Sequence, residues 1–96
     1  MRHATAIDTD TALATCGGFC VEASDGTAGV VEILLFPPDD TIPDFLVLRV
    51  GGGLRPRHPV LPAALVDHVD ATSRVVHVHG SRAEIARLPE HLPLAI

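Results

Sequence analysis

The 96-residue sequence contains no lysine, tryptophan or tyrosine, and its only aromatic residues are Phe19, Phe36 and Phe45. Because aromatic side chains usually supply much of the buried area of a core, this core must consist mainly of Val, Leu, Ile and Ala. Apolar runs such as residues 33–36 are too short to cross a membrane. The N-terminal Met-Arg-His lacks the apolar stretch of a signal peptide. We therefore expect neither a transmembrane segment nor a leader.

Basic residues are also scarce, and the formal net charge is −5. Nucleic-acid phosphates are neutralised by basic faces, so the charge argues against DNA as a partner and makes RNA an unfavoured one. The two cysteines, Cys16 and Cys20, would lie about 13 Å apart in an extended chain, too far for a disulfide. The intervening Gly17-Gly18 leaves a strained or intermolecular bridge open. We expect two reduced thiols in a cytoplasmic protein.

The length of the chain allows one domain. Eight glycines and eight prolines are more than a helical bundle of this size would carry, and they favour many short strands. We expect a loosely ordered arm over residues 1–15, with one helical turn near 11–15. The folded domain should span residues 16–90, and residues 91–96 should form an extended tail.

The strongest local signal is Asp25-Gly26 between two runs rich in Val, Ile and Phe. This dipeptide favours a hairpin whose two central turn residues both take positive φ. The expected strands are 18–24 and 27–36, and Pro37-Pro38 ends the second of them. Further strands are expected at 45–50 and 58–61.

A last hairpin is expected from residues 65–71 and 74–79, with a tight connection around Thr72-Ser73. In this register His68 faces His77 and Val69 faces Val76. Ser81 and Glu84 have the spacing of a capping box, which predicts a short helical turn. The fold class predicted from these elements is all-β, a small six-stranded β-barrel with a short C-terminal helical turn.

With these elements placed, the chain resembles the PRC-barrel family, as a stand-alone single-domain member. The matching segments are residues 18–21 with 24–31, 46–48, 60–70, 75–78, 81–85 and 88–89. The sequence departs from the family pattern after Gly29, where members often carry a basic residue. The resemblance implies a PRC-type barrel that serves protein–protein contact in bacteria and archaea. It carries no catalytic residues or cofactor, so we expect no enzyme activity.

Three histidines could share the outward face of the last hairpin: His68, His77 and His79. Imidazoles are zinc ligands, so a metal- or small-ligand-binding barrel is one alternative function. The favoured interpretation is a set of solvated or partly packed histidines on an exposed face. A milder possibility is a pH-sensitive surface, because crowded imidazoles charge near pH 6. Arg55 and Arg57 follow a glycine run, but Pro56 and Pro59 leave no helix to complete a phosphate loop. These arginines are expected to be solvated, and they could dock an acidic partner.

The runs at residues 30–36 and 45–48 are apolar on both alternating faces, whereas a barrel strand needs only one buried face. We assign Val31, Ile33 and Leu35 to the interior. The surplus forms an expected outer apolar face, which marks an interface. Its predicted interface residues are Val30, Leu34, Phe36, Phe45 and Val47.

The expected function is a protein-interaction or scaffold module that forms a homo-oligomer, a dimer, or binds a protein partner through this face. A third function class, an adaptor associated with ribosomes or RNA processing, follows from the family resemblance and is disfavoured by the charge.

Overall fold

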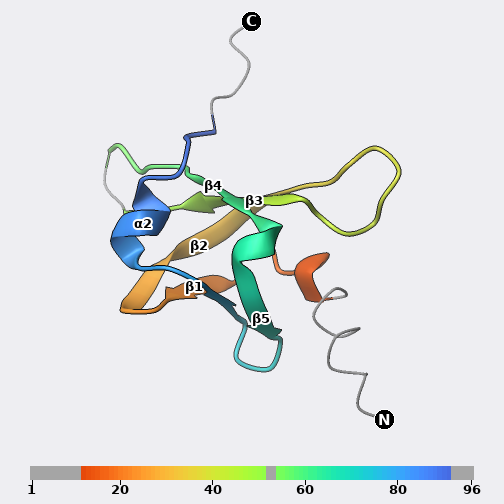
Figure 1. Ribbon diagram of the computed structural model, residues 1–96, viewed down its shortest axis with the longest axis horizontal. Coiled ribbons are helices and arrows are strands. Elements are labelled where there is room, and N and C mark those ends of the chain that lie inside the picture. The colour runs from red at the N-terminus through yellow and green to blue at the C-terminus, as the bar shows by residue number, and fades with distance from the viewer. Residues whose placement is uncertain (1–11, 52–53, 92–96) are drawn as a thin grey trace, which may run out of the picture.

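The computed structural model describes residues 12–51 and 54–91. Most of the described chain is β-structure (Figure 1). The elements are β1 (Cys20–Ala23), β2 (Gly26–Leu35), β3 (Phe45–Arg49), β4 (Val60–Pro62), the 3₁₀ turn η1 (Ala63–Leu65), β5 (Val66–Asp70), β6 (Val75–Val78) and α2 (Arg82–Ala86). The prediction of six strands followed by one short helix is therefore confirmed.

The six strands form one sheet in the order β4-β3-β2-β1-β6-β5. All neighbours are antiparallel except β1 and β6, which run parallel. The edge strands β4 and β5 are not paired with each other in the described chain, so the sheet is not a closed barrel. The sheet is nevertheless rolled. Its edges would lie about 24 Å apart if it were flat, but η1 joins Pro62 to Val66 over a chain length of at most about 14 Å.

The core lies on the inner side of this rolled sheet. Short aliphatic side chains dominate it, as the scarcity of aromatic residues requires. The buried core cluster consists of Leu13, Cys16, Phe19, Val21, Ala28, Val31, Leu46, Leu48, Leu61, Val76, Val78 and Ile85. Ile85 comes from α2, which lies against one end of the sheet beside β2 (Figure 1).

The first hairpin turns one residue earlier than predicted. Ala23 pairs with Gly26, so Ser24 and Asp25 are the turn residues. Gly26 takes the positive φ, 136°, whereas Asp25 does not. The prediction that Asp25 and Gly26 occupy the two central positions is therefore wrong. The glycine opens β2, where its freedom of φ lets the chain re-enter the sheet.

The carboxylate of Asp25 has a different use, because it accepts a hydrogen bond from the backbone N–H of Arg82 at 2.8 Å. The backbone N–H of Ser24 also donates to the carbonyl of Gly80. Together these bonds fix the start of α2 against the hairpin turn. The predicted capping box is confirmed: Ser81 accepts from the N–H of Glu84, and Glu84 accepts from the N–H of Ser81.

A β-bulge in β2 decides which residues face the core. Val31 pairs with Leu48 and Ile33 pairs with Val47, so Glu32 is an extra residue on β2. An extra residue reverses the alternation of all positions beyond it. Ile33 is consequently 41% exposed, and our assignment of Ile33 to the interior is wrong.

Candidate functional site

The outer side of the β2–β3–β4 region carries two rows of directly paired apolar residues. The first row is Ile33, Val47 and Val60, and the second row is Leu35, Phe45 and Pro62. Directly opposite residues of antiparallel strands point to the same side of the sheet. These six residues are called the outer apolar face below.

Part of the outer apolar face remains in contact with solvent. Ile33 and Phe45 are each 41% exposed, and the neighbouring Phe36 is 45% exposed. Removing apolar area of this kind from water is favourable by about 25 cal/mol per Å², and this gain is set against the entropic cost of association. The exposed aromatic rings are therefore the natural anchors of a contact.

The edge of the sheet next to this face is covered by the chain itself. Residues 89–91 run antiparallel to residues 58–60. The N–H of Val60 donates to the carbonyl of Pro89, and the N–H of His91 donates to the carbonyl of His58. Because this edge is already paired, a partner would meet the face rather than add a strand here.

A hollow of about 200 Å³ opens on the outer apolar face. It is lined by Glu32, Ile33, Val47, His58 and His91. Val47 is fully buried, although it does not belong to the core cluster. The carboxylate of Glu32 lies 3.2 Å from Nε2 of His58 and 3.5 Å from Nε of Arg49, which gives the hollow a charged rim.

The five predicted interface residues differ in their exposure and in the side of the sheet to which they point. Phe36 and Phe45 are exposed as expected, and Val30 is half-buried beside Arg49. Val47 points outward but is fully buried, so it offers no surface. Leu34 pairs with the core residue Leu46 and packs against the core, because the bulge at Glu32 turns it inward. Sequence reasoning missed Ile33 and Leu35, and no residue pattern marks the bulge.

The histidines of the last hairpin do come together, on the outer side of β5 and β6. His68 pairs with His77 as predicted, and their rings stack with centroids 4.3 Å apart. Asp67 is the extra residue of a second bulge. Its carboxylate lies 3.0 Å from Nδ1 of His68 and 3.5 Å from Nε2 of His79.

In the described parts of the chain, no group of three or more His, Cys, Asp or Glu side chains is arranged to hold a metal ion. The nearest approach to such a group, around Asp67, consists of exposed side chains that bond to one another.

Arg55 and Arg57 lie in the connection between β3 and β4, and both are exposed. Arg57 also bonds to Val50 through both backbone groups, and its side chain lies 3.6 Å from Glu90. At the tip of this connection Leu54 is fully exposed. The guanidinium of Arg57 therefore has an acidic neighbour within the chain itself.

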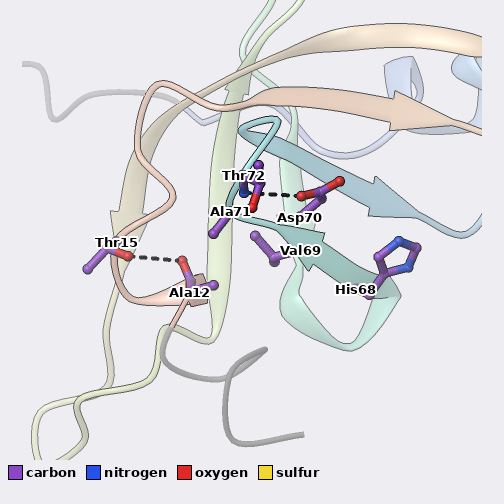
Figure 2. Close-up of a pocket in the computed structure, with 7 residues that line it drawn as sticks. All are labelled: Ala12, Thr15, His68, Val69, Asp70, Ala71 and Thr72. Atoms are coloured by element: carbon purple, nitrogen blue, oxygen red, sulfur yellow. Dashed lines mark hydrogen bonds between the residues drawn. The ribbon is translucent and has the colours of Figure 1, made fainter. Parts of the chain in front are cut away.

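Another hollow, of about 560 Å³, lies between β5 and the segment that precedes β1 (Figure 2). Its polar groups bond locally. Asp70 accepts hydrogen bonds from the N–H groups of Thr72 and Ser73, and the hydroxyl of Thr15 donates to the carbonyl of Ala12. Figure 2 shows the Thr72–Asp70 and Thr15–Ala12 bonds and the side chain of His68 turned to one side.

The shifted pKa values also reflect structural roles. Burial raises the pKa of the Cys16 thiol to about 11, which makes the thiolate scarce at neutral pH. The hydrogen bond from the Arg82 N–H lowers the pKa of Asp25. Hydrogen bonds from Ser73 lower the pKa of Asp70. Cys16 and Cys20 are both free thiols.

No protein-family model matches the chain, and a search of curated proteins finds no significant relative. Within the described residues, no helix has the length and hydropathy that a membrane span requires.

Proposed function

We propose that the chain is a non-enzymatic interaction module of PRC-barrel type that self-associates through the outer apolar face. The observation that carries this proposal is the pair of apolar rows on the solvent side of β2, β3 and β4. Ile33 and Phe45 are each 41% exposed there. Exposed apolar patches of this kind mark interaction sites on soluble proteins.

The PRC-type assignment rests on the motif order in the sequence. A six-stranded sheet whose edge strands are joined by one short 3₁₀ turn is compatible with it. The non-enzymatic assignment rests on how the chain uses its polar groups. Ser81 caps α2, Ser73 bonds to Asp70, and Cys16 is a buried thiol with a raised pKa.

The test is the molar mass in solution, measured by size-exclusion chromatography with light scattering. The Ile33→Asp variant places a charge at an exposed position of the face, and we expect it to shift the protein from dimer to monomer. The control is Leu54→Asp, which adds the same charge at a fully exposed loop position away from the sheet. It should leave the molar mass unchanged. A wild-type protein that stays monomeric at millimolar concentration would refute self-association.

A further inference from the structure

The hollow on the outer apolar face has the size and walls of a receptor for an aromatic ring. Its volume is about 200 Å³, and the exposed Ile33 forms its accessible apolar wall, with the buried Val47 beneath. A protein cavity of about 150 Å³ is known to accept benzene. The imidazoles of His58 and His91 also line the hollow, and they can pack against a phenyl ring.

A phenyl ring stands close to this hollow on the same strand. Phe45 is 41% exposed and lies on the outer side of β3, two residues before Val47. Two residues of a strand span about 7 Å. Because the side chains at positions 45 and 47 both point outward from β3, the phenyl ring projects from the surface beside the hollow and does not fill it.

A projection and a hollow side by side are self-complementary under two-fold symmetry. Consider two copies whose outer apolar faces meet with their β3 strands antiparallel. A two-fold axis that lies between the faces, perpendicular to β3 and level with Leu46, brings position 45 of each copy opposite position 47 of the other. Each Phe45 then enters the hollow of the partner copy, and both contacts form at once. This reciprocity favours a second copy over an unrelated protein as the occupant.

We propose that two copies of this chain pack face to face about a two-fold axis, with Phe45 of each copy inserted into the hollow above Val47 of the other. This inference rests on the proposed self-association and specifies its contact. The face consists of six residues, whereas a standard interface contains roughly 20–30 residues per partner. The dimer should therefore be weak, and it should be studied at high protein concentration.

The test uses two variants that remove opposite halves of the contact. Phe45→Ala removes the ring and keeps the hollow, whereas His91→Trp fills the hollow and keeps the ring. Each variant alone should weaken dimerisation, measured by analytical ultracentrifugation, by about 10-fold or more. Phe36→Ala is the matched control, since it removes an equally exposed ring outside the paired rows, and it should have a smaller effect.

The decisive measurement is a mixture of the two variants, each labelled with a different fluorophore. A mixed dimer contains one complete contact, in which Phe45 of the His91→Trp chain enters the hollow of the Phe45→Ala chain. Energy transfer in the mixture should exceed that in mixtures of either variant with itself. Ile33→Trp, which fills the hollow from its other wall, replaces His91→Trp if that variant fails to fold.

The outcomes separate the two proposals. A wild-type protein that is monomeric, or whose association is insensitive to Ile33→Asp, overturns the proposed function. A dimer that is broken by Ile33→Asp, but in which the mixture shows no recovery, leaves the proposed function standing and overturns the ring-in-hollow contact. Equal effects of Phe45→Ala and Phe36→Ala would also overturn this contact.

Discussion

The two ends of the sheet have opposite outer surfaces, although they are built in the same way. Each end contains a β-bulge whose extra residue is acidic: Glu32 on β2 and Asp67 on β5. Each carboxylate lies near two basic or imidazole groups. Glu32 lies near Arg49 and His58, and Asp67 lies near His68 and His79. Around Glu32 the outer surface is apolar, whereas around Asp67 it is polar.

The comparison shows when a bulge decides which residues of a strand face the core. Over residues 68–70 of β5 and 76–78 of β6, polar and apolar residues alternate, so burial requires one face there and the pairing of His68 with His77 follows. On β2, both alternating sets are apolar. Burial then favours neither set, and the bulge at Glu32 decides that Leu34 faces the core and Ile33 faces solvent.

The strongest test of this difference replaces each of the two neighbouring residues Leu34 and Ile33 with aspartate. Leu34→Asp places a carboxylate against the core, and we expect it to lower the free energy of unfolding by at least about 2 kcal/mol. Ile33→Asp changes an exposed side chain and should cost less than about 1 kcal/mol. Urea denaturation of both variants at low protein concentration measures the difference.

If Ile33→Asp proved the more destabilising of the two, β2 would have no bulge at Glu32. The core-facing and the outward-facing residues of β2 beyond Glu32 would then be exchanged.

A second prediction concerns Gly29, which lies on β2 just before the bulge. A Cβ atom at this position would lie 2.5 Å from the carbonyl oxygen of Arg49 on β3, so the two strands would have to separate. Gly29→Ala should therefore destabilise the protein by about 1–3 kcal/mol in thermal or urea unfolding.

Gly17→Ala is the matched control, because a Cβ atom there meets nothing within 4 Å. Equal stabilities of the two variants would contradict the close approach of β2 and β3. The polar end offers no equivalent test, since β5 and β6 contain no glycine.

The smallest expected effect lies at the polar end and depends on pH. Hydrogen bonds from Ser73 lower the pKa of Asp70 below its ordinary value of 3.8. The folded state therefore favours the carboxylate, and this contribution to stability is present above about pH 4 and is lost as pH falls through the folded-state pKa. Asp70→Asn should be less stable than the wild type at pH 7, and the difference should shrink by pH 3.

Thermal melts at pH 7, 5 and 3 measure this difference. Asp39→Asn, a substitution in the loop after β2, is the control and should follow the wild type at each pH. A difference between Asp70→Asn and the wild type that is constant with pH would show that the charge of Asp70 does not contribute.

Much of the secondary structure could be predicted because its signals are local. The capping box of Ser81 and Glu84 lies within one helical turn, and the alternation of β5 and β6 fixes their register. The candidate site was predicted only in part. Phe36 and Phe45 were found because the apolar surplus is visible in the sequence. Ile33 was missed because its direction depends on pairing with β3.

By itself, the sequence determined that this chain forms a sheet of six short strands with a small aliphatic core, and that apolar residues remain in surplus at one end. Turn residues, alternation and caps act between close neighbours, so their effect can be seen in the sequence. The tertiary structure alone decided where the bulges fall, which face of β2 is buried, and that Asp25 binds the start of α2. These features depend on strands and turns that meet only after folding, where hydrogen bonding and packing are satisfied together.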